Sequence, residues 1–72
     1  MSELEYQLLR GVRDSDYWSQ DTFYFLKYVD ANVTVVTAVI AMEGLIKRGY
    51  VARGYGYRLT VKGCDALDGV KL

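Results

Sequence analysis

Leucine and valine recur near the start of the chain at the spacing of one helical face. Leu4, Leu8 and Val12 are four residues apart, so they lie on one side of a helix that we expect to end at about residue 13. Ser2 and Glu5 have the spacing of a capping box, in which each side chain accepts a hydrogen bond from the other residue's backbone N–H. The pattern therefore predicts an amphipathic helix that begins directly after Ser2.

Two further helical patterns follow, separated by a short polar turn at residues 30–32. The first begins near Gln20 and ends at Val29. The second is capped by Thr34 and ends at Gly49, and its apolar stripe contains Ala38, Ala41, Met42, Leu45 and Ile46. Residues 33–40 are rich in β-branched side chains and would also suit a strand, but the length and the stripe favour a helix.

A β-hairpin and a last helix complete the pattern. Residues 50–53 and 57–60 flank a Gly54-Tyr55-Gly56 tip, which predicts two strands joined by a tight turn. Thr60 is a suitable N-cap for a final helix, which we expect to direct Cys64 and Leu67 inward and to end at Gly69. The fold class expected is α+β: three helices, a two-stranded hairpin and a C-terminal helix.

This order of elements is that of a winged helix-turn-helix. Residues 45–51, L-I-K-R-G-Y-V, and 57–63, Y-R-L-T-V-K-G, resemble the junction between the third helix and the wing, and the second wing strand, of MarR-like and PadR-like regulators. Residues 56–67 are also similar to the N-terminal winged-helix domain of RIO-type kinases, without any kinase domain. The resemblance implies the fold and leaves the ligand open, because winged helices bind DNA, RNA or proteins.

Length and composition indicate one small domain over residues 1–72. The chain is 51% hydrophobic and 25% charged, which is enough apolar material for a core, and it contains no proline and no repeat that would mark a linker. The longest apolar stretch, residues 33–42, is half the ~20 residues that a membrane-spanning helix needs. A single cysteine allows no internal disulfide, so we expect a cytoplasmic protein with no membrane segment.

The sequence contains few of the residue types on which enzyme active sites depend. The chain has no histidine and one cysteine, which removes histidine-based triads and thiolate metal sites. Cys64 is interpreted as a small core residue, and Gly54-Tyr55-Gly56 as a turn rather than a phosphate-binding loop. We therefore expect no catalytic residues, no metal, no cofactor and a function that depends on binding.

The charges are distributed unevenly along the chain. Residues 1–33 contain six acidic and three basic residues, whereas residues 44–64 contain five basic residues and no acidic one. Such a basic segment at a wing suits the phosphates of double-stranded DNA, although it also fits a solvated strand edge. The leading hypothesis is a transcriptional regulator, acting as a homodimer, whose nucleic-acid-binding residues are Lys47, Arg48, Arg53, Tyr55, Arg58 and Lys62.

The outer face of the helix at residues 34–48 supports a different hypothesis. It carries aliphatic side chains where a DNA-reading helix would carry polar ones, so it could instead bind a protein partner, unless the helix is more deeply buried than the resemblance implies. Two tyrosines on the polar side of the preceding helix also suit an interface, although aromatic residues at this spacing are usually packed in a core. The interface expected under this alternative consists of Val35, Val36, Val39, Ile40, Tyr24 and Tyr28.

Overall fold

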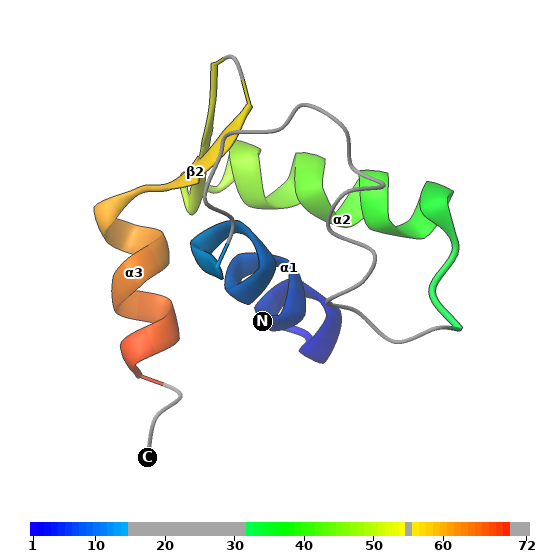
Figure 1. The fold of residues 1–72 in the computed structure, drawn as a ribbon, viewed down its shortest axis with the longest axis horizontal. Coiled ribbons are helices and arrows are strands. Elements are labelled where there is room, and N and C mark those ends of the chain that lie inside the picture. Colours follow the sequence, from blue (N-terminus) through cyan, green and yellow to red (C-terminus); the bar gives the residue numbers. More distant parts are fainter. Residues whose placement is uncertain (15–31, 55, 70–72) are drawn as a thin grey trace.

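Three helices and an antiparallel hairpin make up the part of the chain that the computed structural model describes, residues 1–14, 32–54 and 56–69 (Figure 1). The expected α+β class is thus confirmed, and the helix expected at residues 20–29 lies outside the described residues. In chain order the elements are α1 (Glu3–Asp14), α2 (Val35–Lys47), β1 (Val51–Arg53), β2 (Tyr57–Leu59) and α3 (Val61–Asp68).

The capping box at the start of α1 forms as expected. The Ser2 amide donates to Glu5 Oε1 at 2.8 Å, and the Glu5 amide donates to Ser2 Oγ at 3.2 Å. Leu8 and Val12 are buried, as the spacing predicts, but so is Leu9. The buried face of α1 is therefore wider than one stripe, because other elements pack on more than one side of this helix.

α2 begins and ends at the two residues that the sequence indicates. Thr34 Oγ1 accepts a hydrogen bond from the Thr37 amide at 3.2 Å, which caps the start. At the other end Gly49 has a φ of +85°, its amide donates to the Ile46 carbonyl, and the Tyr50 amide donates to the Leu45 carbonyl. These two bonds form a Schellman motif, which uses the helix-terminal carbonyls and turns the chain into the hairpin. The choice of helix over strand is confirmed.

The hairpin projects beyond the helices at one side of the molecule (Figure 1). Its strands pair in a register that places Val51 opposite Leu59 and Arg53 opposite Tyr57. A hydrogen bond of 2.9 Å from the Gly54 amide to the Gly56 carbonyl closes the turn. Both expected strands are present, each one residue shorter than predicted.

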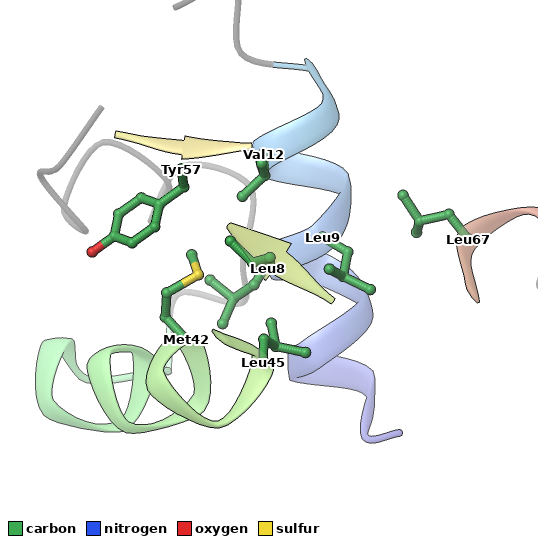
Figure 2. Packing of buried hydrophobic residues seen from close by; sticks show 8 residues of the cluster. Leu8, Leu9, Val12, Met42, Leu45, Tyr57 and Leu67 are labelled. Atoms are coloured by element: carbon green, nitrogen blue, oxygen red, sulfur yellow. The ribbon is translucent and has the colours of Figure 1, made fainter. Parts of the chain in front are cut away.

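The core lies around α1, with α2 and the hairpin on one side and α3 on the other (Figure 2). Leu8 lies close to Met42 and Leu45 of α2, and Leu67 of α3 lies on the opposite side of α1 (Figure 2). Burial of these side chains supplies most of the stabilisation available to a chain of 72 residues. The buried cluster consists of Leu8, Leu9, Val12, Met42, Leu45, Val51, Tyr57 and Leu67.

Thr60 joins α3 to the base of the hairpin. Its hydroxyl accepts from the Gly63 amide, which caps α3 as predicted, and donates to the Gly49 carbonyl. The expectation that Cys64 faces the core is wrong, because its side chain is exposed. Gly63 takes the inward position, since a Cβ there would lie 2.2 Å from the Tyr50 carbonyl oxygen. Cys64 is rotated from it by about 100°, towards solvent.

In the described ranges, no helix has the length and apolar character needed to cross a bilayer.

Candidate nucleic-acid interface

The five basic residues of segment 44–64 come from consecutive elements around the hairpin. All five are exposed. The fold therefore brings a run of cations in the sequence to one region of the chain's surface, on both sides of the hairpin base. They are Lys47 at the end of α2, Arg48 at its C-cap, Arg53 on β1, Arg58 on β2 and Lys62 in the first turn of α3.

The two hairpin arginines point to opposite faces of the sheet. Arg58 pairs across the strands with Ala52, and Arg53 pairs with Tyr57, whose side chain is buried. Because cross-strand partners share a face and neighbours along a strand alternate, Arg53 lies on the face that turns to the core and Arg58 on the outer face. They do not form one basic surface, as the sequence alone would suggest.

Arg53 contacts the body of the molecule through an exposed ion pair. Its Nη1 atom lies 3.0 Å from Glu43 Oε1 on α2, and its guanidinium carbon lies 5.9 Å from the centre of the Tyr57 ring. The side chains of Arg53 and Glu43 are 49% and 46% exposed. Ion pairs in such surroundings contribute about 0–1 kcal/mol, so a phosphate can replace Glu43 at little cost.

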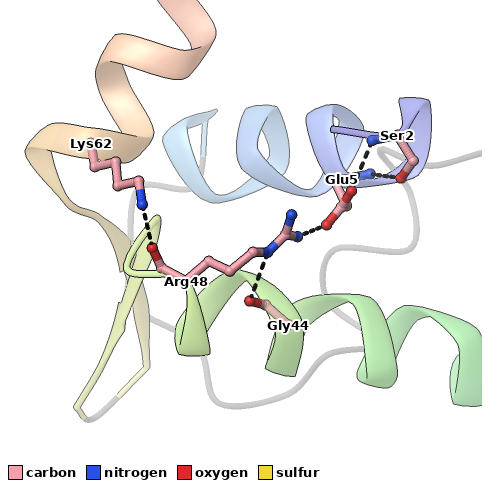
Figure 3. Close-up of polar contacts among 5 residues, drawn as sticks. All are labelled: Ser2, Glu5, Gly44, Arg48 and Lys62. Carbon is pink, nitrogen blue, oxygen red and sulfur yellow. Dashed lines mark hydrogen bonds and ion pairs between the residues drawn. The ribbon is translucent and has the colours of Figure 1, made fainter.

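Arg48 is held by groups from two other places in the chain (Figure 3). Its guanidinium forms an ion pair with Glu5 Oε2 and donates from Nε to the Gly44 carbonyl at 3.2 Å. The Glu5 side chain is 15% exposed and also accepts from the Ser2 amide through its other oxygen. Arg48 thus ties the start of α1 to the end of α2, a structural role that the sequence analysis did not assign to it.

Lys62 closes the same junction from α3. Its Nζ atom donates to the Arg48 carbonyl at 2.8 Å (Figure 3). The same atom lies 4.6 Å from the centre of the Tyr50 ring. The Arg48 guanidinium lies 5.6 Å from the same ring. Tyr50 therefore has two cations near its ring. Since the partners of Lys62 are neutral, its positive charge is not cancelled by these contacts.

A basic residue outside this region has a different environment. Arg13, at the end of α1, donates to Asp14, and this hydrogen bond together with the charges of Asp14 and Asp68 raises the pKa of its guanidinium. Arg13 therefore lies near two acidic groups, Asp14 of α1 and Asp68 at the end of α3. The contrast marks the hairpin region as the more cationic part of the described surface.

The outward face of α2 is apolar. Val36 and Ile40 are 67% and 66% exposed, and Val39 is exposed to a lesser degree. Val35, expected on the same surface, is half-buried, because it begins the helix nearer to the side that packs on the core. Before Glu43, Thr37 is the one residue on this outward face whose side chain can hydrogen-bond to a base edge. Its hydroxyl is hydrogen-bonded to the Thr34 hydroxyl.

Three of the residues predicted to form a binding surface, Tyr24, Tyr28 and Tyr55, lie outside the described residues.

The ion pairs that two acidic residues form at this surface were not predicted from the sequence. Glu43 was expected on the outer face of the helix, one turn from Val39 and Ile40, but its pairing with Arg53 was not predicted. Glu5 carries no local signal for its contact with Arg48, since the two residues are far apart in the sequence and meet only in the folded chain.

Comparisons of the chain with protein-family models, with curated proteins and with solved structures find no match.

Proposed function

We propose that the chain binds double-stranded DNA as a small winged-helix domain and acts as a regulator of transcription. The order of α2, hairpin and α3 is compatible with a winged-helix layout. The observation that carries the proposal is that all five basic side chains of segment 44–64 are exposed around the hairpin, in a segment that contains no acidic residue. Such a surface can replace the counterions of a phosphate backbone, and release of those ions drives binding.

The roles of the basic residues differ within this proposal. Lys47 and Arg58 are the primary phosphate contacts, and Arg53, on the other face of the hairpin, contacts a separate phosphate when that phosphate replaces Glu43. Arg48 and Lys62 mainly hold the hairpin in place through Glu5 and the Arg48 carbonyl. Loss of the first group should weaken DNA binding without loss of the fold, whereas loss of the second should also destabilise the hairpin base.

The experiment is a fluorescence-anisotropy titration of a random-sequence duplex at several salt concentrations. With three phosphate contacts, log Kd should rise with log salt concentration with a slope of roughly 3. Arg58→Ala or Arg53→Ala should each lower this slope by about one without altering sequence preference. Arg13→Ala is the matched control, because it removes one exposed arginine beside acidic groups. Absent or salt-insensitive binding would reject the proposal.

A second candidate function is protein contact through the outward face of α2, including self-association. It is favoured by the exposure of Val36, Val39 and Ile40. Burial of each side chain offers about 1.5–3 kcal/mol, against an association cost of about 4–15 kcal/mol, so this face alone supports weak contact. Val39→Glu should then abolish any assembly detected by sedimentation while circular dichroism stays unchanged. An assembly of unchanged mass would reject this candidate.

A further inference from the structure

α2 is apolar on two opposite sides. One side contributes Met42 and Leu45 to the core, and the other presents Val36, Val39 and Ile40 to solvent. Residues three and four positions apart are neighbours on a helix, so the three exposed side chains form one patch, named here the outward strip. Aliphatic side chains in such a patch are stabilised when another apolar surface covers them.

The spacing along the outward face suits a second helix. The central row of this face contains, at intervals of four, three and four residues, Val36, Ile40, Glu43 and Lys47. These intervals are the a/d spacing with which two helices pack along each other in a coiled coil. The first two positions are apolar and the last two carry opposite charges. A helix laid along α2 therefore meets apolar side chains first and charged ones towards the end.

The charges of α2 favour a second copy of this chain as the source of that helix. Towards the end of α2, the carboxylate of Glu43 is half-exposed beside Arg53. The first turn of α2 contains no acidic residue, so the partial positive charge of the helix start is not compensated from within the helix. An antiparallel second copy brings these two opposite charges together twice. The formal net charge of the chain is zero, so two copies do not repel each other.

One antiparallel register satisfies the apolar and the charged positions together. A two-fold axis at the level of residue 38 places Val36 opposite Ile40 of the second copy and repeats this contact on the other side of the axis. Glu43 and the N-cap Thr34 lie five and four residues from the axis, in opposite directions. With a rise of about 1.5 Å per residue, Glu43 lies level with the second copy's N-cap to within about 1.5 Å along the helix.

We infer that two copies of the chain associate through their outward strips as an antiparallel α2 pair with this register. The inference rests on the second candidate function, protein contact through this face, and adds to it the partner and the geometry. It does not depend on DNA binding. Because each hairpin follows the end of its own α2, the two hairpins lie at opposite ends of the helix pair. The paired strips therefore leave the basic residues of both hairpins uncovered.

The size of the outward strip sets the strength of the association. A helix of 13 residues is about 20 Å long and 10–12 Å across, so its outward face covers on the order of 200 Å². Stable protein interfaces bury about 800 Å² on each partner. The dimer is therefore weak, and it forms only at high protein concentration.

Sedimentation equilibrium over a range of protein concentrations measures the association. The mass should rise from that of a monomer towards that of a dimer and no further, because a two-fold contact closes on itself. Ile40→Glu should raise the dimer Kd by at least about tenfold, since it places a charge in the apolar contact. Val61→Glu is the matched control, because Val61 is 79% exposed but lies on α3, and it should leave the Kd unchanged. Circular dichroism checks that both variants are folded.

Disulfide cross-linking tests the register, and it traps a weak dimer. Cys64 is exposed and is first replaced by serine, so that it forms no disulfide of its own. Chains with Val36→Cys and chains with Ile40→Cys are then mixed and oxidised. The mixed disulfide should form at least about fivefold faster than either like-with-like disulfide, because the register places these two positions opposite each other. Mass spectrometry separates the three products.

A charge variant tests the contact of Glu43 with the helix start of the second copy. Glu43→Lys should raise the dimer Kd by about threefold or more, because it places a positive charge beside a partial positive charge. Glu3→Lys makes the same change in net charge at an exposed residue of α1 and should have no such effect.

The outcomes that overturn the inference are distinct from those that overturn the functions it accompanies. A monomeric mass at all concentrations, with no cross-linked product, would reject the dimer. Like-with-like disulfides that form as fast as the mixed one would reject the antiparallel register and leave contact through this face standing. An assembly unchanged by Ile40→Glu would reject the dimer and the second candidate function together. Failure to bind DNA would reject the leading proposal and leave this inference unaffected.

Discussion

Gly63 is the residue at which two parts of the backbone come closest. A Cβ at this position would lie 2.2 Å from the Tyr50 carbonyl oxygen and 3.3 Å from a Leu59 methyl. Since the nearest atom is a backbone oxygen that also accepts from the Thr60 amide, it cannot move without opening the base of the hairpin. The absence of a side chain here lets α3 start directly beneath the strands.

Gly63→Ala should therefore destabilise the protein by about 1–3 kcal/mol or more, the cost of overpacking a site that cannot relax. Gly69→Ala is the control, because a Cβ there meets its nearest atoms at 3.5 and 3.6 Å, which is ordinary contact. Unfolding in urea, followed by circular dichroism, measures both. Equal midpoints for the two variants would show that the contact between Gly63 and Tyr50 is not tight.

The exposed position of Cys64 shows where residue-level prediction failed. Cysteine is among the residue types most often found fully buried, so the sequence favoured Cys64 over its neighbour Gly63 as the residue that faces the core. What decided the orientation of α3 was the steric demand of the Tyr50 backbone, which comes from a segment more than ten residues earlier in the chain. No local pattern carries that information.

At the scale of the element, the helix termini were the most predictable part of the chain. Ser2 with Glu5, Thr34, Gly49 and Thr60 each mark an end by a mechanism that acts within a few residues, and each forms the expected bond or conformation. The same locality explains the correct turn of the hairpin. Strand register and the face to which each side chain points were harder to predict, because both depend on what each strand packs against.

Thr60→Val should cost more stability than the same change at Thr34, although both residues cap a helix. The Thr34 hydroxyl accepts from the Thr37 amide and also bonds to the Thr37 hydroxyl, but both bonds are exposed and lie within one helical turn, so its loss should cost about 1 kcal/mol. The Thr60 hydroxyl caps α3 and also donates to the Gly49 carbonyl, so its loss should cost about 2 kcal/mol. Thermal unfolding of the two variants provides the comparison. A larger loss for Thr34→Val would contradict the bridging role of Thr60.

At the scale of the whole molecule, more of the positive charge of residues 44–64 is paired with acidic side chains than the sequence indicates. Arg48 and Arg53 are paired with Glu5 and Glu43, which lie outside residues 44–64. Counting charges within a segment therefore overstated the positive charge of the surface, because folding brings acids from α1 and α2 to it. The position of the basic region was predictable; its partial neutralisation was not.

Glu43→Gln should strengthen DNA binding by about two- to fivefold. The substitution releases Arg53 from an exposed ion pair that holds it by roughly 0.2–1 kcal/mol, and it removes a negative charge beside the proposed phosphate path. Glu3→Gln, which breaks the exposed pair with Arg10 on α1, is the control for the same change in net charge. Titration of one duplex with both variants gives the answer. An equal gain from Glu3→Gln would mean that Arg53 has no special role.

The pairing of Arg53 with Tyr57 makes the register of the hairpin a determinant of what the surface presents. Because side chains alternate along a strand, a slip of β2 by a single residue relative to β1 would exchange the two faces of β2. Arg58 would then turn inward and Tyr57 outward, and both the buried cluster and the basic surface would lose a member. A slip of two residues would keep the alternation, so the register of the two strands decides which side chains reach the core and which reach solvent.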